Sequence, residues 1–186
     1  MSSKKYKGKP CVYCVEAIAT TGDHVIGRNF FLEHRRANLP QVPACKSCNS
    51  AKSELENYLM VVLGFGARHP DASVNLRTMI LKRLNKNAGL RAELEAGFTK
   101  SGGTTIPFDH VRFNKLFAMI AQGLLWYHWQ ALLGPGYSAI AATFSDLGIG
   151  FFEQAVAKLS TPNRVVGNLG ENTFNPTYPE VLLHDL

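Results

Sequence analysis

The 186-residue chain lacks any apolar run long enough to cross a membrane. A membrane span needs roughly 18 to 20 consecutive apolar residues, and the most apolar stretch, Leu116 to Leu133, is interrupted by Gln122, His128 and Gln130. The charged first segment is not followed by the apolar stretch of a secretory signal. We therefore expect a soluble cytoplasmic protein, with no membrane partner, in which thiols stay reduced.

The chain also does not have the low hydrophobic content that is typical of disordered proteins. Hydrophobic residues make up 46% of the sequence. A chain of this length can bury roughly 70% of the surface that its unfolded form exposes. This composition excludes disorder along the whole chain and predicts one folded domain of ordinary size, or one compact module carrying an extension.

Acidic residues are scarce in the first 53 residues. This segment has nine basic and three acidic side chains, a net charge of +6, whereas residues 54 to 186 have eleven of each. A concentration of positive charge attracts phosphate backbones and releases their counterions. Nucleic acid is therefore the expected partner, DNA before RNA, and a solvated basic surface is the alternative.

Cysteine occurs only in two Cys-x-x-Cys pairs, Cys11 with Cys14 and Cys45 with Cys48. In a reducing compartment, two such pairs are typical of a structural zinc ion held by four thiolates. A thioredoxin-like site would need one pair near a βαβ pattern, and disulfides would need export. We therefore favour zinc, with inert buried cysteines as the alternative.

Two short β-prone stretches lie between the cysteine pairs. Asp23 and His24 begin the first stretch, which continues to Ile26. Asn38 precedes the second stretch, which is extended through Val42 and leads into the second cysteine pair. The two stretches predict the strands of a hairpin with a long loop between them.

Asn49 follows directly after the second cysteine pair. Asparagine is a frequent N-cap, and apolar residues follow it at helical spacing. We therefore predict that Asn49 opens a helix over Ser50–Leu63.

These residues, in this order, resemble the HNH endonucleases of the ββα-metal type. The similarity is to the four-cysteine zinc group, in which two cysteine pairs bracket the catalytic hairpin, as in recombination endonuclease VII of phages. It covers roughly residues 8 to 60. His24 matches the first H of the motif, Asn38 the middle N, and Asn49 the final H, which many members replace by Asn. Asp23 matches the carboxylate that commonly precedes the first His.

The resemblance implies an enzyme that hydrolyses DNA phosphodiester bonds and leaves 5′-phosphate and 3′-hydroxyl ends. His24 would be the general base, since the usual imidazole pKa of about 6.5 lies near working pH. Asp23 and Asn49 would hold Mg²⁺ or Mn²⁺, which prefer oxygen ligands. Asn38 would orient the loop and the His24 ring. Because successive strand side chains point to opposite faces, we expect Asp23 and His24 to have separate roles.

Basic side chains around this module are the candidate DNA contacts. They are four lysines expected to form a flexible N-terminal arm, three arginines of the hairpin loop, and two lysines near the second cysteine pair: Lys4, Lys5, Lys7, Lys9, Arg28, Arg35, Arg36, Lys46 and Lys52. Glu56 lies near one helix face with Asn49 and Lys52, where it could support the metal. A solvated helix face is the alternative for these residues.

Two other functions stay open. A noncatalytic zinc-knuckle protein that binds nucleic acid, or an adaptor, could keep the HNH frame as a scaffold. Such a scaffold would not require Asp23, His24 and Asn49 together. The nuclease effector of a toxin or phage-defence system would make the same cuts with an added trigger.

The chain changes character after residue 63. We predict a nuclease module over residues 1 to 63 and a mostly helical companion region over residues 64 to 186, with an apolar core of its own. Glycines at positions 64 and 66 are expected to end the first helix. Later elements are predicted as helices over Ser73–Asn87, Gly89–Ala96, Asp109 (as N-cap of the longest helix) to about Leu133, and Gly150–Ser160, with extended runs over Arg164–Leu183.

The predicted fold class is therefore α+β: a ββα-metal module with zinc knuckles, followed by a helical region. That region could bind a protein partner or a second copy of the chain.

Overall fold

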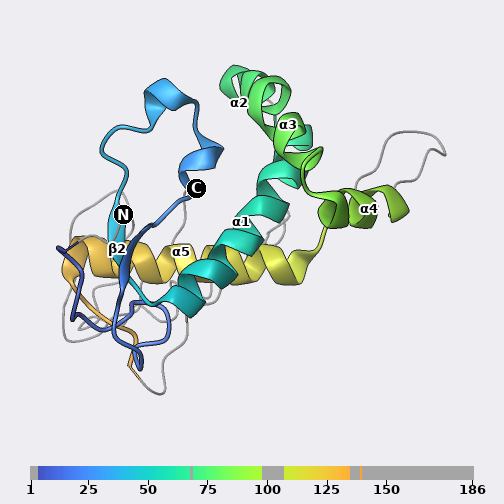
Figure 1. The fold of residues 1–186 in the computed structure, drawn as a ribbon. Helices are drawn as coiled ribbons and strands as arrows, with labels where there is room; N and C mark the ends of the chain where they lie inside the picture. The colour runs from blue at the N-terminus through green and yellow to red at the C-terminus, as the bar shows by residue number, and fades with distance from the viewer. Residues whose placement is uncertain (1–3, 68, 98–106, 135–138, 140–186) are drawn as a thin grey trace, which may run out of the picture.

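The structure is a computed structural model that describes residues 4–67, 69–97, 107–134 and 139. It combines a two-stranded antiparallel sheet with helices, which confirms the α+β class (Figure 1). In chain order the elements are β1 (Thr21–His24), η1 (Arg28–Phe30), η2 (Glu33–Arg35), β2 (Gln41–Ala44), α1 (Lys46–Gly66), α2 (Pro70–Asn75), η3 (Leu76–Ile80), α3 (Leu81–Leu84), α4 (Ala88–Ala96) and α5 (His110–Trp129). The predictions for Gly150–Ser160 and Arg164–Leu183 lie outside the described residues.

Strands β1 and β2 form a hairpin with a long connection that contains the 3₁₀ turns η1 and η2. Thr21 pairs with Ala44 at one end of the sheet, and His24 pairs with Gln41 at the other. The strand predicted to run from His24 to Ile26 therefore begins earlier and ends at His24. The chain bends after this residue, although Val25 still donates a backbone hydrogen bond to the Pro40 carbonyl (2.9 Å).

Helix α1 begins four residues earlier than predicted. Its N-cap is Cys45, whose sulfur accepts a hydrogen bond from the Cys48 amide (3.4 Å). Asn49 is therefore inside the first turn and is not the cap. The helix also continues through the predicted glycine break to Gly66, because Gly64 lets Ile80 pack closely: a Cβ on Gly64 would lie 2.9 Å from Ile80 Cδ1.

Helices α2 and α3 join through the π-helical turn η3 into one helical arm over residues 70–84. The arm begins three residues before the predicted start because Pro70 occupies its first turn and the His69 ring accepts a hydrogen bond from the Asp71 amide (3.1 Å). The sequence pattern did not predict the π turn.

Helices α4 and α5 agree closely with the sequence prediction. The Asp109 carboxylate caps α5 by accepting hydrogen bonds from the amides of Val111 and Arg112. Helix α5 ends at Trp129 and not near Leu133, because Gln130 adopts a left-handed conformation with φ 55°. At 20 residues, α5 is slightly shorter than the 21-residue α1, so it is not the longest described helix.

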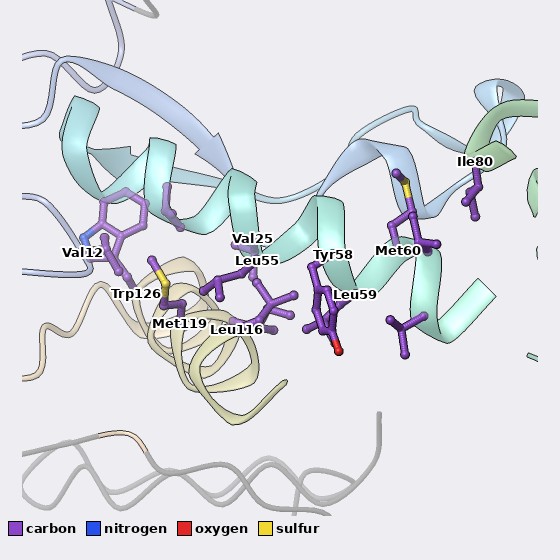
Figure 2. Packing of buried hydrophobic residues seen from close by; sticks show 14 of the residues in the cluster. Val12, Val25, Leu55, Tyr58, Leu59, Met60, Ile80, Leu116, Met119 and Trp126 are labelled. Atoms are coloured by element: carbon purple, nitrogen blue, oxygen red, sulfur yellow. The ribbon is translucent and has the colours of Figure 1, made fainter. Parts of the chain in front are cut away.

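One hydrophobic cluster spans both predicted regions. Val25 and Leu55 come from the hairpin and α1, whereas Leu116, Met119 and Trp126 come from α5 (Figure 2). The boundary expected after residue 63 falls inside α1, and the apolar core expected for the later residues is continuous with that of the hairpin. Helix α5 therefore supports the sheet that carries the site.

Within the described part of the chain, no helix is both long enough and apolar enough to span a membrane.

Candidate functional site

The four cysteines lie together at one end of the hairpin. Their Sγ atoms all lie within 4.8 Å of one another, and those of Cys14 and Cys45 are 4.0 Å apart. Four thiolates about 2.3 Å from a tetrahedral zinc ion lie about 3.8 Å from one another. The cluster is therefore close enough to hold a metal such as zinc, as the cysteine spacing predicted.

Backbone hydrogen bonds shape the first cysteine loop and attach it to the sheet. The Val15 amide donates to the Cys11 carbonyl (2.8 Å), and Val15 takes the left-handed conformation with φ 62°, which is unusual for a β-branched residue. The Val12 amide donates to the Pro43 carbonyl in β2 (3.0 Å). The second pair is fixed by the start of α1, so β2, which leads into α1, holds the two loops side by side.

The pKa values of three of the thiols depend on burial and on their neighbours. Burial raises the pKa of Cys11 and that of Cys48. Burial also acts to raise the pKa of Cys45, but hydrogen bonds from the Cys48 amide and the neighbouring thiols outweigh it and lower that pKa. Since four neighbouring thiolates repel one another, full ionisation requires a cation, which is the behaviour of a metal site.

Asp23 lies at the other end of the hairpin and is buried. Its Oδ2 atom accepts a hydrogen bond from the Tyr13 hydroxyl (2.6 Å) and lies 3.1 Å from Lys52 Nζ. Burial and the Asp23 charge raise the pKa of Tyr13, so its hydroxyl stays protonated and can donate. Both contacts go to Oδ2, which leaves Oδ1 for another ligand.

Lys52 has a different place from the one predicted for it. Its side chain is fully buried, and its ammonium donates to the His24 carbonyl (2.7 Å) and to Glu56 Oε1 (2.5 Å) in addition to facing Asp23. The expected DNA contact is therefore wrong, because the ammonium lies beneath β1 between two carboxylates. Burial raises the pKa of Glu56, although Lys52 opposes this shift.

The ring of His24 is half-buried and contacts its cross-strand neighbour. His24 Nε2 lies 2.8 Å from Gln41 Nε2. Burial, and then the positive charge of Arg28, lowers the pKa of His24 below its usual 6.5, so the ring is neutral at pH 7. A neutral imidazole is the form that a general base needs.

Asn38 does not take the position expected for a residue that holds the His24 ring. It is exposed in the turn before β2, with φ 59°, a left-handed conformation that asparagine adopts more readily than most residues. Gln41 contacts the ring in its place. Asn38 can still shape the turn that leads into β2.

A cavity of about 310 Å³ opens beside Asp23 and His24. Its lining comes from the end of β1, the loop that follows and α1: Asp23, His24, Gly27, Arg28, Asn29, Arg36 and Glu56. Although Asp23 and His24 are successive strand residues, both reach this cavity. Asn49 is half-buried and is not among the lining residues.

Gly27 allows the Glu56 carboxylate to approach the loop. A Cβ at this position would lie 2.5 Å from Glu56 Oε2, too close for any contact between these atoms. The cavity thus brings together carboxylates, an imidazole and guanidinium groups. Its carboxylate oxygens suit a hard divalent cation, and its arginines suit an anion such as phosphate.

The arginines predicted to bind DNA lie along this loop. Arg28 is exposed at the cavity. Arg36 is half-buried, and its Nε donates to the Phe31 carbonyl (3.1 Å). Arg35 is exposed and forms an ion pair with Asp71 (3.7 Å). Only Arg28 and Arg36 therefore border the cavity among these three.

The predicted lysine contacts are exposed but do not all belong to a free arm. Lys4, Lys5, Lys7, Lys9 and Lys46 are exposed. The flexible-arm prediction is wrong for residues 4 to 10, because Tyr6 is buried against Trp126, with ring centroids 6.1 Å apart, and donates to the Gln41 carbonyl (3.0 Å). This anchor fixes the lysines near β2.

The sequence pattern missed two residues that contact the predicted catalytic side chains. Tyr13 lies inside the first cysteine pair, which was interpreted only as a metal motif. Gln41 is recognisable as a partner of His24 only once the pairing register of the hairpin is known.

Comparisons of the chain with family models, with curated proteins and with solved structures give no match.

Proposed function

We propose that the chain is a metal-dependent endonuclease of the HNH type that hydrolyses phosphodiester bonds in DNA. The main support is one observation: Asp23, His24 and Glu56 meet Arg28 and Arg36 around a single cavity. This cavity lies at one end of a hairpin whose other end adjoins the four-cysteine cluster. The chain order of two strands and a helix agrees with the ββα frame of that family.

His24 would accept the proton of the attacking water. Its lowered pKa keeps the ring neutral, and Gln41 holds the ring from the opposite strand. The proposal requires the tautomer in which Nε2 carries the proton and donates it to the Gln41 amide oxygen, because Nδ1 is then free to act as base. The oxygen and nitrogen of an amide exchange places by a simple flip, so this arrangement fits the same contact.

Asp23 would hold a divalent ion such as Mg²⁺ or Mn²⁺ through Oδ1, while Tyr13 and Lys52 hold Oδ2. Asn49 is the predicted second ligand, and Glu56 offers a further carboxylate at the cavity. When bound, such an ion stabilises the charge that builds on the phosphoryl oxygens. Arg28 and Arg36 would bind the phosphate and orient it toward His24.

A second candidate is the noncatalytic zinc-knuckle protein. Two observations favour it: the Lys52 ammonium already neutralises the carboxylate that would hold the ion, and Asn49 does not line the cavity. In that case the basic surface would bind nucleic acid without cutting it. A toxin or phage-defence effector would share the chemistry of the first candidate.

The test is the nicking of supercoiled plasmid with added Mg²⁺ or Mn²⁺. We expect His24→Ala to lower the rate by about 10²- to 10⁴-fold, the usual contribution of a general base. The matched control is His34→Ala, which changes an exposed histidine of the same loop and should cut at the normal rate. Bound zinc should be unchanged in both variants.

Nicking that persists at the wild-type rate in His24→Ala would contradict the assigned base. A wild-type protein that binds plasmid but never nicks it with either ion would instead favour the noncatalytic candidate.

A further inference from the structure

Unpaired basic side chains gather on the helical arm, outside the proposed catalytic cavity. Between Asp71 and Glu93 the sequence has five basic residues and no acidic one. All five are exposed: Arg77, Lys82, Arg83, Lys86 and Arg91. Arg91 pairs with Glu95 (2.7 Å), whereas the ion pairs found among the described residues include none of the other four. The net charge of +6 at the N-terminal end is therefore not the chain's only positive surface.

These four exposed side chains follow one another along the second half of the arm and the turn after it. Lys82 and Arg83 lie in α3, and Lys86 lies in the turn that follows it, where its amide donates to the Arg83 carbonyl (3.0 Å). Arg77 lies in the π turn Leu76–Ile80, five residues before Lys82. Because a π turn contains more residues than an α-helical turn, it brings residues five apart closer to the same face. Turns of this kind are rare in proteins, and many of those that occur lie at functional sites.

The arm is fixed directly to the loop that borders the catalytic cavity. The buried Asn75 side chain donates to the carbonyls of Asn29 (3.0 Å) and Phe30 (3.3 Å). An Arg36 guanidinium nitrogen lies 3.3 Å from Met79 Sδ. Asn29 and Arg36 both line the cavity. In Figure 1 the loop and the α2–α3 arm rise on the same side of α1, away from α5.

The arm that carries the basic side chains therefore extends from the loop at the rim of the cavity. Asp71, which pairs with Arg35 of the loop, and Leu84, the last residue of the arm, are thirteen residues apart. At about 1.5 Å per helical residue, this separation corresponds to at most about 20 Å. One base pair of duplex DNA occupies about 3.4 Å, so the arm reaches roughly six base pairs along a duplex that enters the cavity.

We infer that the α2–α3 arm and the turn that follows it bind the phosphate backbone of duplex DNA on one side of the cleavage point, through Arg77, Lys82, Arg83 and Lys86. This inference rests on the proposed function, because the duplex is placed by the cavity. It gives the arm a role in substrate binding, and it predicts contacts that do not depend on base sequence.

The experiment measures binding and cutting by the full chain. A fourfold variant, Arg77→Gln with Lys82→Gln, Arg83→Gln and Lys86→Gln, removes the charges. A matched variant keeps the charges by exchanging lysine and arginine at the same four positions. Binding of a fluorescent 30-base-pair duplex is followed by anisotropy over a range of salt concentrations in the His24→Ala background, so that no cutting interferes.

We expect the charge-removing variant to bind at least tenfold more weakly at low salt. The slope of log affinity against log salt should fall by about three to four, since each lost phosphate contact lowers it by about 0.9. The charge-keeping variant should retain the wild-type slope. With His24 present, the plasmid concentration at half-maximal nicking should rise and the maximal rate should stay the same.

Two outcomes separate this inference from the proposed function. If the charge-removing variant keeps the wild-type slope while the wild type nicks plasmid, the inference about the arm is wrong and the endonuclease proposal stands. If the slope falls as expected but the wild type never nicks, the arm binds DNA and the hydrolysis proposal fails. An arm that serves an acidic protein partner would give the first result.

Discussion

The four-cysteine cluster and the polar cavity lie at opposite ends of the same short hairpin. Ala44, paired with Thr21, leads directly into the second cysteine pair, whereas Gln41, paired with His24, adjoins the cavity. The cluster is built from two loops with fixed internal spacing. The cavity is built from side chains that only the folded hairpin and α1 bring together. We therefore expect closure of the cluster to be a condition of folding and the cavity to be a result of it.

Tyr13 connects the two ends. It lies between Cys11 and Cys14, yet its hydroxyl bonds to Asp23 at 2.6 Å. Closure of the first cysteine loop thus orients the carboxylate that we propose as a metal ligand.

The largest expected effect comes from breaking the cluster. Replacing Cys45 and Cys48 together with serine should abolish zinc binding and unfold the hairpin, because zinc contributes about 10–16 kcal/mol to the folding of comparable small sites. Metal analysis should fall from about one zinc per chain to none, and circular dichroism should show loss of structure. Replacing the neighbouring Ser47 and Ser50 with alanine is the control, since both are exposed in the same turn. A double variant that is well folded without zinc would refute the idea that folding of the hairpin depends on the cluster.

The second-largest effect tests whether the buried Lys52, which pairs with Asp23 and Glu56, stabilises the fold. Lys52→Met should lower the free energy of unfolding by about 3–5 kcal/mol, because it leaves the Asp23 and Glu56 carboxylates buried without their cation. Lys46→Met, an exposed change in the same helix, should cost little. Urea unfolding measures both.

The deficit of Lys52→Met should depend on pH. The pKa of Glu56 is raised by burial, and removing Lys52 removes a group that opposes that shift. A raised pKa in the folded state gives stability that is lost as pH rises through it. The difference from the wild type should therefore grow from about pH 5 to pH 8. An equal deficit at both values would show that the carboxylates do not carry the effect.

A smaller effect tests the connection between the two ends. Tyr13→Phe removes one hydroxyl and should weaken Mn²⁺ binding at the cavity about 10- to 100-fold, as expected when a partner of a metal ligand is lost. Zinc content should not change. Electron paramagnetic resonance of Mn²⁺ gives the affinity without any cutting assay, and Tyr127→Phe, at an exposed position, is the control. Unchanged Mn²⁺ affinity would mean that Lys52 alone orients Asp23.

The smallest effect concerns the charge at the cavity rim. Burial, and then the charge of Arg28, lowers the pKa of His24 below its usual value of 6.5. The nicking rate should therefore fall on the acid side of its pH profile (the acid limb) only below pH 6.5. Arg28→Gln removes one of these causes, so the acid limb should move toward higher pH. Arg35→Gln, outside the cavity lining, should leave the limb unmoved. A limb that moves equally in both variants would indicate a general charge effect.

Sequence reasoning worked where the chemistry is local. Four cysteines at fixed spacing predicted a cluster that could hold a metal, because each pair closes its own loop. Asp109 was identified as a cap because its carboxylate bonds to amides two and three residues away. Neither prediction needed the tertiary structure.

Sequence reasoning failed where a distant element decides the outcome. Lys52 has the spacing of an exposed helix face, and only the packing of β1 over α1 shows that its ammonium is buried. A cysteine N-cap gives no sequence signal that competes with Asn49, since sulfur is a weak acceptor. The contact between Gln41 and His24 depends on a register that a long loop leaves undetermined.

The shared core has a consequence for any attempt to isolate the hairpin and α1 as a smaller protein. A fragment cut after residue 63 would keep every proposed ligand and base, but it would expose Val25 to water where Leu116, Ile120 and Trp126 now cover the cluster. Gly123 of α5 packs closely against Val25: a Cβ added to Gly123 would lie 3.1 Å from both methyl carbons of Val25. If this hairpin is moved into another protein, α5, or another helix that can pack equally close to Val25, must therefore accompany it.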